Sequence, residues 1–373
     1  MRMPADVRLP TTIGGIPTPA LVLDVAALDR NIRRMAAVFS TGPCRLRPHF
    51  KAHKTPEIAR RQLAAGSCTG LTCATVSEAE IASALCDDIL IANEVVGPGK
   101  AARVAALARR VRITIAADSV RGLEEISGAA VAGGVTVGVL VDVNVGQMRC
   151  GVTPGDEALA LARLVAAAPG VELRGVMGYE GHLQNVVDRA ERERRARAAM
   201  DALVSTARQM RGQGLPCAMV SAGGTGTYDI SGGVEGVTEI QAGSYLLMDT
   251  DYAGLGLPFE HACFVLGTVI SRPDPARCIA DCGHKSTTKD HGLPGLQGMP
   301  GAAVIALHDE HATISLPPGS AIAVGDQVHL LPSHIDPTVN LHDVFYVVEG
   351  DRVVDAWPIE ARGYREHRTP ARG

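Results

Sequence analysis

The sequence is poor in aromatic residues, with one Trp, six Tyr and five Phe among 373 residues. This small aromatic content gives no specific indication of a stacked aromatic substrate. Basic tracts interleaved with aromatic residues, which are typical of nucleic-acid binding, are also missing, and the formal net charge is only -4. Glu191 and Glu193 interrupt the basic run from Arg189 to Arg197, so we interpret this run as the solvated face of a helix.

Paired cysteines and long apolar runs are absent as well. The nine cysteines occur singly, with no C-x-x-C pair, which predicts reduced thiols and not a disulfide framework. No apolar run reaches the roughly 18 residues that a membrane span needs. Residues 1–10 lack the apolar segment of a signal peptide. We therefore expect a cytoplasmic enzyme that has neither nucleic acid nor membrane as a partner.

What the chain does contain is one theme repeated from about residue 21 to residue 252, a short β-branched run followed by an alanine-rich helical stretch. Several runs are continuously apolar, as expected for parallel strands with both faces covered. Eight such units are typical of a (β/α)8 barrel. A doubly wound open sheet is the alternative, although about five to seven strands would be more usual there. The eight predicted strands cover 45–51, 70–75, 88–93, 112–118, 135–144, 173–180, 217–223 and 237–243.

Beyond residue 252 the alanine-rich stretches stop and short alternating runs begin, separated by Gly/Pro turns. This pattern predicts a small antiparallel β-domain, with which the segment near Ile13–Ile16 is expected to pair. The fold class is therefore α/β, a TIM-like barrel over 18–256 plus a smaller, mainly antiparallel β-domain over 1–17 and 257–373. The predicted strands of this domain cover 263–271, 277–281, 302–307, 312–316, 327–331, 344–349 and 352–358.

Two lysines and two histidines occur close together in the run from Arg47 to Lys54, at the end of the first predicted strand. Lysines are rarely buried unless they have a task, and barrels keep their chemistry at the carboxyl ends of their strands. A lysine amine there can form a Schiff base with a carbonyl cofactor. Two surface lysines after a strand are the alternative interpretation.

Two glycine-rich turns, 222–226 and 241–244, follow the seventh and eighth predicted strands. Barrels often hold a phosphate group on backbone N–H groups at these positions, although each turn alone also fits a plain tight turn. Together with a reactive Lys51, the two turns point to pyridoxal phosphate. Further polar side chains at predicted strand ends are Thr75, Asn93, Glu94, Asp118, Asp142, Asn144, Arg149, Tyr179 and His182.

Arg149 is a candidate partner for the cofactor's ring nitrogen. An arginine there cannot give up its proton, so the ring nitrogen tends to stay unprotonated and the ring is a weaker electron sink. A surface arginine in the loop 146–151 is the alternative.

A possible metal site lies in the segment 331–337, Leu-Pro-Ser-His-Ile-Asp-Pro. If this segment is extended, His334 and Asp336 face the same side and can ligate one ion. Two protein ligands leave positions open for water or substrate, which suits Mn²⁺, Mg²⁺ or a catalytic Zn²⁺. A surface histidine with other partners is the alternative.

Along nearly its whole length the chain resembles the D-threonine aldolase family. That family belongs to the alanine-racemase-like (fold type III) pyridoxal-phosphate enzymes, with D-serine dehydratase and 3-hydroxy-D-aspartate aldolase and dehydratase as relatives. The stretches that carry the resemblance are 18–24, 47–54, 77–79, 93–98, 145–151, 223–227, 239–245 and 332–343.

The resemblance implies a role for each matching residue. Lys51, and not Lys54, would be the Schiff-base lysine, and Arg149 would face the pyridine nitrogen. His334 and Asp336 would bind the divalent metal, Mn²⁺ or Mg²⁺ sooner than Zn²⁺ because carboxylates suit harder ions. A homodimer is also implied. The residues that would hold the cofactor, mostly through its phosphate, are Tyr179, Thr225, Gly226, Gly243 and Ser244.

The implied activity is retro-aldol cleavage of a D-β-hydroxy-α-amino acid, with a dehydratase that releases ammonia and a 2-oxo acid as the alternative. One departure bears on this choice. Asn185 stands where family aldolases tend to have a histidine that helps with the substrate hydroxyl, and His182 is the candidate substitute. An amino-acid racemase would need a second base, for which no tyrosine is clearly placed. A non-catalytic cofactor carrier is disfavoured by the β-domain and the metal pair.

Overall fold

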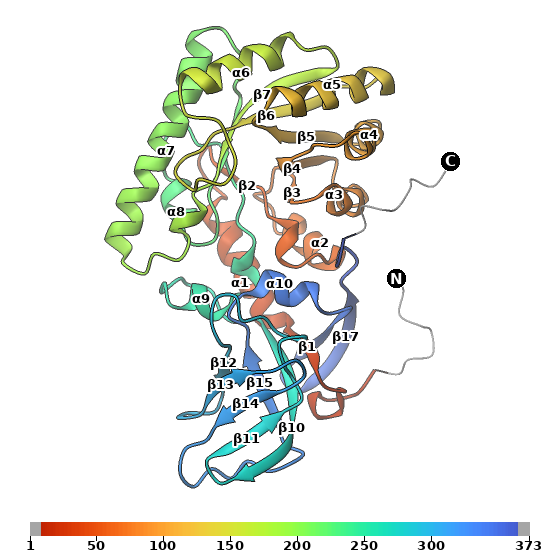
Figure 1. Cartoon of the computed structure of the whole chain (residues 1–373), viewed down its shortest axis with the longest axis vertical. Helices are drawn as coiled ribbons and strands as arrows, with labels where there is room; N and C mark the ends of the chain where they lie inside the picture. Colours follow the sequence, from red (N-terminus) through yellow and green to blue (C-terminus); the bar gives the residue numbers. More distant parts are fainter. Residues whose placement is uncertain (1–8, 365–373) are drawn as a thin grey trace. The chain divides into compact units, whose positions relative to one another are not determined.

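The computed structural model describes residues 9–364 and contains two β-sheets, one of eight strands and one of nine (Figure 1). Contacts divide the chain into two compact units. The barrel unit comprises Met35–Lys51 and Ala59–Gly243, and the β-sheet unit comprises the described residues up to Arg34, Ala52–Ile58 and Ser244–Gly363. The outermost parts of the predicted β-domain, 1–8 and 365–373, lie outside the described residues.

The barrel unit contains all eight strands that the repeated pattern predicts. Every neighbouring pair is parallel. The order is β2-β9-β8-β7-β6-β5-β4-β3, and the bridges Leu46–Cys68 and His49–Thr72 connect the two ends. The TIM-like barrel is therefore confirmed, and the open-sheet alternative is wrong because β2 closes the sheet. The strands are β2 (Arg45–Leu46), β3 (Leu71–Cys73), β4 (Asp88–Glu94), β5 (Arg112–Ala117), β6 (Val137–Asp142), β7 (Val171–Gly178), β8 (Met219–Ala222) and β9 (Glu239–Ile240).

Helices alternate with these strands, and their ends carry recognisable caps. The Thr75 hydroxyl accepts a hydrogen bond from the Glu78 N–H at 3.1 Å, and the Asp188 carboxylate accepts one from the Glu191 N–H at 2.8 Å. Such side chains satisfy N–H groups that the first helical turn leaves without a partner. The helices are α1 (Val25–Val38), α2 (Pro56–Ala64), α3 (Val76–Ala82), α4 (Pro98–Leu107), α5 (Val120–Gly133), α6 (Asp156–Ala167), α7 (Arg189–Gly212) and α8 (Tyr228–Ser231).

Buried apolar side chains fill the space enclosed by the parallel strands. One cluster joins Leu90, Ala116, Leu140 and Met177, which come from four consecutive strands, β4 to β7. Layers contributed by successive strands make the interior of such a barrel a packed core and not a pore. Polar side chains of the barrel unit that could carry chemistry are therefore expected at the strand ends and in the loops.

The β-sheet unit is mainly antiparallel, as predicted. Its strands follow the order β13-β14-β11-β10-β1-β16-β17, with β15 paired to β10 and β12. All seven predicted runs form strands, and β12 is an additional one. The strands are β10 (Cys263–Asp274), β11 (Arg277–Ala280), β12 (Gly295–Gln297), β13 (Ala303–Leu307), β14 (Ala312–Ser315), β15 (Gln327–Leu331), β16 (Val344–Glu349) and β17 (Arg352–Pro358). Two short helices, α9 (Thr250–Ala253) and α10 (Ile335–Asn340), complete the unit.

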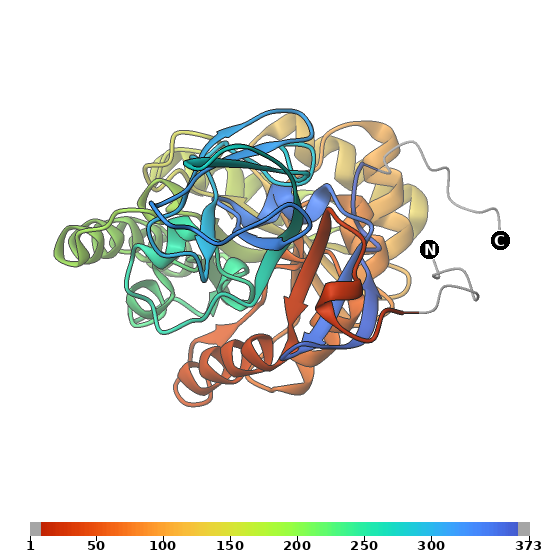
Figure 2. The same ribbon diagram turned by 90° about the horizontal axis from the view of Figure 1, so that it is seen from below.

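The strand β1 (Ala20–Asp24) belongs to this second sheet. It pairs antiparallel with β10 and parallel with β16 (Figure 2), although its residues fall in the range 18–256 predicted for the barrel. Those domain limits remain a prediction. The N-terminal segment contacts the same sheet through an antiparallel bridge between Thr12 and Arg352, and Ile13–Gly15 form a 3-10 turn. Within the described residues, no helix is long and apolar enough to span a bilayer.

Candidate active site

Lys51 follows β2, at the carboxyl end of the first barrel strand. The backbone continues to bond to the neighbouring chain segment past the strand, since the Arg47 N–H donates to Ile240 O at 2.8 Å and the His49 N–H to Ala242 O at 3.0 Å. Pro48 has no N–H to add to this ladder. Residues Phe50–Ala52 then form a 3-10 turn in which Phe50 is fully buried and Lys51 is half-buried. Backbone hydrogen bonds and the buried Phe50 thus fix the position of Lys51 at the carboxyl end of the strand, where barrels carry their catalytic residues.

A buried carboxylate fixes the glycine turn that follows β8. Glu180 is 0% exposed. It accepts hydrogen bonds from the Thr227 hydroxyl at 2.7 Å, the Ser231 hydroxyl at 2.5 Å and the Gly223 N–H at 3.2 Å. Three donors satisfy this charge in the absence of solvent. The turn therefore has one defined shape.

Gln184 holds the same turn from a second side. Its Oε1 accepts the Gly226 N–H at 2.7 Å, and its Nε2 donates to the Thr227 hydroxyl at 3.0 Å. A Cβ on Gly226 would lie 2.2 Å from Gln184 O, and one on Gly224 would lie 2.5 Å from Gln184 Oε1. Glycine is therefore required at position 226, where the obstacle is backbone, whereas a side chain at position 224 would displace the Gln184 amide that holds the turn. The buried Thr225 stands between them.

Replacing Glu180 by alanine is expected to loosen this turn. Three donors lose their acceptor, so we expect the free energy of unfolding to fall by roughly 2–4 kcal/mol. Urea unfolding measures this effect. The surface variant Glu193→Ala, which breaks only an exposed pair with Arg197, should change stability by less than about 0.5 kcal/mol. Unchanged stability in Glu180→Ala would contradict the assigned role.

Arg149 lies on the loop after β6, and its side chain is exposed. The guanidinium carbon lies 5.7 Å from the centroid of the Tyr179 ring, which is within the range of a cation–π contact. The two side chains line a small pocket together with Asp142, Val143, Asn144, Val145, Gln147 and Cys150. The structure therefore brings two of the predicted cofactor residues together.

Asp142 is a candidate functional residue to which the sequence pattern assigned no role. It ends β6 and is 6% exposed. Burial raises its pKa from 3.8 to about 8, and the charge of Glu94 and a hydrogen bond with that residue add to the effect. Acidic residues at or just beyond the ends of three neighbouring strands, Glu94, Asp118 and Asp142, were the signal that could have indicated such a group.

Replacing Asp142 by asparagine is expected to change how stability depends on pH. A carboxyl group with a raised pKa in the folded state contributes stability below about pH 4, and this contribution is lost as pH rises towards about 8. The variant cannot ionise, so it should exceed the wild type in stability near pH 8 by roughly 1–3 kcal/mol. Melting temperatures between pH 5 and pH 9 measure the difference. Asp201→Asn, at an exposed position of α7, is the control, and parallel curves for wild type and Asp142→Asn would refute the expectation.

His334 and Asp336 lie at the start of α10, in the β-sheet unit. His334 is the extended N-cap residue, and Asp336 lies in the first helical turn. The expectation that both share one extended segment is therefore wrong, because the helix begins at Ile335. Pro337 is compatible with a first turn, where the missing N–H costs nothing. Asp336 accepts a hydrogen bond from the Ser244 hydroxyl at 3.2 Å.

The buried Asp249 anchors the start of α10. Its carboxylate accepts the Ile335 N–H at 3.0 Å and the Tyr252 N–H at 2.9 Å. Burial raises its pKa to about 6, although these hydrogen bonds oppose the rise. The backbone position of His334 is thus fixed by a group that the sequence pattern did not single out.

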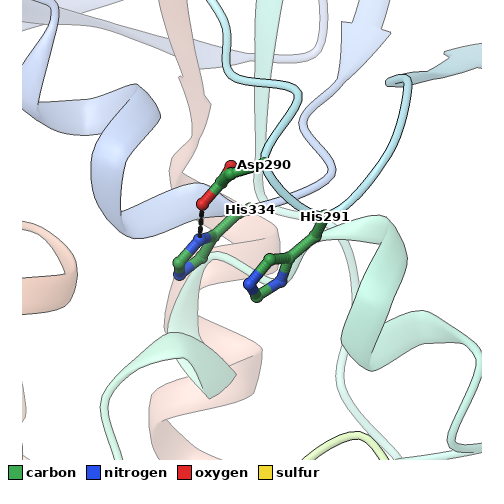
Figure 3. Close-up of side chains that lie close together, drawn as sticks. All are labelled: Asp290, His291 and His334. Carbon is green, nitrogen blue, oxygen red and sulfur yellow. Dashed lines mark hydrogen bonds and ion pairs between the residues drawn. The ribbon is translucent and has the colours of Figure 1, made fainter.

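Two further residues contact the His334 ring, and a third contacts one of these two. Its Nδ1 lies 2.6 Å from Asp290 Oδ2, and its ring is stacked on that of His291 (Figure 3). His291 Nδ1 lies 2.7 Å from Asp251 Oδ2. Asp290, His291 and His334 form a group that could hold a metal ion. Sequence reasoning missed Asp290, His291 and Asp251, and an acid next to an imidazole before Gly292 was the available signal.

The predicted catalytic residue His182 lies in the 3-10 turn Gly181–Leu183 of the barrel unit. Its side chain is exposed. A Cβ on Gly146 would lie 3.1 Å from its ring, so the imidazole packs against the loop that leads to Arg149. Burial lowers its pKa, and the Arg195 charge acts in the same direction.

Comparisons with known proteins match both parts of the chain. Residues 23–251 match the alanine racemase N-terminal domain family, and residues 262–348 match a serine dehydratase domain family. A D-threonine aldolase from Arthrobacter sp. is 43% identical over 97% of this chain and 97% of its own length. A 3-hydroxy-D-aspartate aldolase from Paracoccus denitrificans is 34% identical over 93% of this chain and 92% of its own length.

A solved structure agrees with these matches. The D-threonine aldolase from Filomicrobium marinum superimposes with a TM-score of 0.92 at 40% identity, covering 96% of this chain and 99% of that chain. The barrel and the second sheet are therefore features that this chain shares with a D-threonine aldolase. The chain is a lyase and belongs to the D-threonine aldolase family of alanine-racemase-like, fold type III enzymes.

Proposed function

We propose that this enzyme cleaves a D-β-hydroxy-α-amino acid resembling D-threonine into glycine and an aldehyde, using pyridoxal phosphate and a divalent metal. The observation that carries this proposal is the likeness to a D-threonine aldolase over almost the entire length of both chains. The substrate is a small amino acid. A homodimer and a cytoplasmic location remain predictions.

Residues that follow the barrel strands along the chain provide donors that fit pyridoxal phosphate. Lys51 would bind the cofactor covalently, and Arg149 and Tyr179 would lie against its ring. Thr225, Gly226, Gly243 and Ser244 would hold it mostly through the phosphate. In support, the turn that carries Thr225 is fixed by Glu180 and Gln184 and has no room for larger residues. When bound, the cofactor supplies an electron-accepting ring that stabilises charge developing at Cα.

The β-sheet unit fits a divalent metal. His334 and Asp336 would be the ligands, and a divalent ion supplies a positive charge that eases deprotonation of a hydroxyl group. In support, His334 carries the carboxylate of Asp290 on its Nδ1. A carboxylate there orients a metal-binding imidazole and makes its other nitrogen more basic. We propose Mn²⁺ or Mg²⁺ before Zn²⁺.

The chain's own residues would move the protons. The Lys51 amine, once released by the substrate, would deliver a proton to Cα and complete glycine. His182 is the residue that the sequence suggests for the substrate hydroxyl. Arg149 would keep the ring nitrogen unprotonated because a guanidinium does not release its proton. The ring alone would then be a weaker electron sink, so the positive charge of the metal would be needed to assist the reaction at the hydroxyl group.

A dehydratase is the second candidate function. The match of residues 262–348 to a serine dehydratase domain family favours it, and so does Asn185 in place of a histidine. The same residues would then assist loss of the β-hydroxyl, and the products would be a 2-oxo acid and ammonia.

Product analysis separates the two reactions. Purified protein with pyridoxal phosphate and Mn²⁺ is given D-threonine and threo-3-hydroxy-D-aspartate, and glycine, aldehyde and ammonia are assayed. We expect glycine with an aldehyde. Ammonia with a 2-oxo acid would replace the proposal by the dehydratase, and L-threonine serves as the stereochemical control.

A further inference from the structure

The loop that carries Arg149 takes its shape from one side chain, that of Asn144. The Asn144 Oδ1 accepts hydrogen bonds from the Gly146 N–H at 3.0 Å and from the Met148 N–H at 3.2 Å. Its Nδ2 donates to Met148 Sδ at 3.3 Å. An asparagine that bonds to the backbone a few residues ahead takes the place of main-chain contacts within a turn. Asn144 therefore determines the path of the chain up to the residue before Arg149.

Met148 has a backbone conformation that needs such support. Its φ is 58°, in the left-handed region that residues with a Cβ rarely adopt. Met148 is 82% exposed, so burial of its side chain does not hold it there. The hydrogen bonds to Asn144 hold this conformation instead. Because Arg149 follows directly, the direction in which its side chain leaves the loop depends on Asn144.

Both ends of the loop are fixed without the Asn144 side chain. Val143 and Val152 form a parallel bridge, and the backbone N–H of Asn144 donates to Val152 O at 2.9 Å. The Gly151 N–H donates to Asp118 Oδ2 at 3.2 Å. Removal of the Asn144 side chain should therefore loosen the loop between these points and leave the barrel strands in place.

The loop also packs against the turn that follows β7. A Cβ on Gly181 would lie 2.3 Å from Gln147 Nε2 and 2.6 Å from Tyr179 Cε1, so the Gln147 amide and the Tyr179 ring both lie against this glycine. The Arg149 guanidinium carbon lies 5.7 Å from the centroid of the same Tyr179 ring. All of these residues belong to the barrel unit. The folded loop thus brings two proposed cofactor residues into contact within one unit.

The direction of the guanidinium matters for its proposed task. A guanidinium is planar and donates hydrogen bonds in a rigid fork, so it reaches a ring nitrogen only from a limited range of directions. Arg149 is exposed, and on a loose loop its long side chain would adopt many other conformations. A group that tunes a cofactor through its ring nitrogen must therefore be held in place.

We propose that Asn144 is a positioning residue for Arg149, which it directs towards the ring nitrogen of pyridoxal phosphate by holding Met148 in its left-handed conformation. The inference rests on the proposed function, because Arg149 has this task only when the cofactor is bound. Asn144 acts through Arg149 and takes no part in a covalent step or a proton transfer. Its loss should therefore alter the electronic state of the cofactor ring without removing a catalytic group.

The first test needs no cofactor. Cys150 follows Arg149 in the loop and is half-buried. Burial and the charge of Glu94 raise the pKa of its thiol, so it should react slowly with iodoacetamide. In protein free of cofactor, Asn144→Ala should speed alkylation of Cys150 roughly fivefold or more, the factor expected from losing one or two hydrogen bonds that close the loop. Mass spectrometry of the Cys150 peptide measures the rate, and Asn144→Asp, which keeps the acceptor oxygen, should retain the slow rate.

Two controls accompany the labelling. Asp188→Ala removes a comparable side-chain acceptor, which bonds to the Glu191 N–H at 2.8 Å at the start of α7, and should leave the Cys150 rate unchanged. Cys217, buried in the same unit, should stay unreactive in every variant. If Cys217 reacts in Asn144→Ala, that variant has lost its fold. Asn144→Ser, whose shorter side chain keeps one acceptor, then takes its place with the same expected direction.

The second test observes the cofactor ring directly. Protein is loaded with pyridoxal phosphate that carries ¹⁵N in its ring, and NMR follows the resonance of that nitrogen across neutral pH. The wild type should show an unprotonated nitrogen throughout, because a guanidinium does not release its proton. Asn144→Ala should shift the resonance towards that of Arg149→Ala, and Asn144→Asp should restore the wild-type value. The kcat for D-threonine should fall roughly 10–100-fold in Asn144→Ala, with little change in KM.

The outcomes separate the two proposals. An unchanged Cys150 rate in a folded Asn144→Ala or Asn144→Ser variant overturns the inference, whatever the activity. Faster labelling with a wild-type ring-nitrogen resonance overturns it as well, because Arg149 would then reach the ring without Asn144. Wild-type protein that takes up no pyridoxal phosphate overturns the proposed function and the inference with it, and this failure is distinct because the labelling uses no cofactor.

Discussion

Lys51→Ala is expected to lower turnover of the D-β-hydroxy-α-amino acid at least about 10³-fold, because it would remove both the proposed covalent attachment of the cofactor and the proposed proton donor. The absorbance of lysine-bound pyridoxal phosphate should be replaced by that of the free cofactor. Glycine assays and absorbance spectra measure the two effects. The alanine variant should remain folded, since the anchor of this turn is the buried Phe50 and not the lysine.

Lys54 provides a matched control three residues further along the chain. Its Nζ donates a hydrogen bond to Asn340 Oδ1 at 3.0 Å, and neither sequence nor structure assigns it to the cofactor. Lys54→Ala should keep most of its turnover and the spectrum of the bound cofactor. A fully active Lys51→Ala enzyme, or a loss that follows Lys54 instead, would remove Lys51 from the mechanism.

His334→Ala is expected to produce the second large loss, roughly 10²–10³-fold in kcat/KM. The substitution removes an imidazole that would hold the metal, and with it the positive charge that assists the hydroxyl group. Asp290, which now lies 2.6 Å from that ring, would lose its partner as well. Assays across a Mn²⁺ titration should show that the variant binds Mn²⁺ much more weakly, so that activity returns only at high Mn²⁺ concentration or does not return.

The cofactor should stay bound in His334→Ala, because the residues proposed to hold it are different. An unchanged absorbance spectrum checks this point, and treatment of the wild type with a chelator should reproduce the loss of activity. Wild-type enzyme that keeps full activity after chelation, with no metal remaining by elemental analysis, would rule out the metal.

The eight barrel strands could be predicted because parallel strands covered on both faces remain apolar without alternation. β6 is an example, with every residue from Val137 to Asp142 buried. The bounds of the strands also predicted that Lys51, Tyr179 and Thr225 lie just after strand ends, because the residues at a strand's end are known once the strand is located. Strand lengths were less accurate. The run 45–51 contains only two strand residues, because Pro48 cannot donate a hydrogen bond and the chain then turns around the buried Phe50.

The pairing of β1 could not be predicted from its own residues. An apolar strand followed by helix α1 has the same pattern as a barrel unit, and its partners β10 and β16 lie far away in sequence. Asp290 and His291 were missed for a related reason. They lie in an irregular loop that has no hydrophobic periodicity, and only tertiary contacts bring them to His334.

The central place of β1 has a consequence for synthesis of the chain on the ribosome. Val22 pairs with Phe264 on one side and Tyr346 on the other, so the first strand to emerge waits for partners made near the end. Pairings so distant in sequence form slowly and leave strand edges exposed meanwhile. The barrel, whose strands all lie between residues 45 and 240, can fold first. The nascent protein should therefore form its barrel unit before its β-sheet unit can be completed.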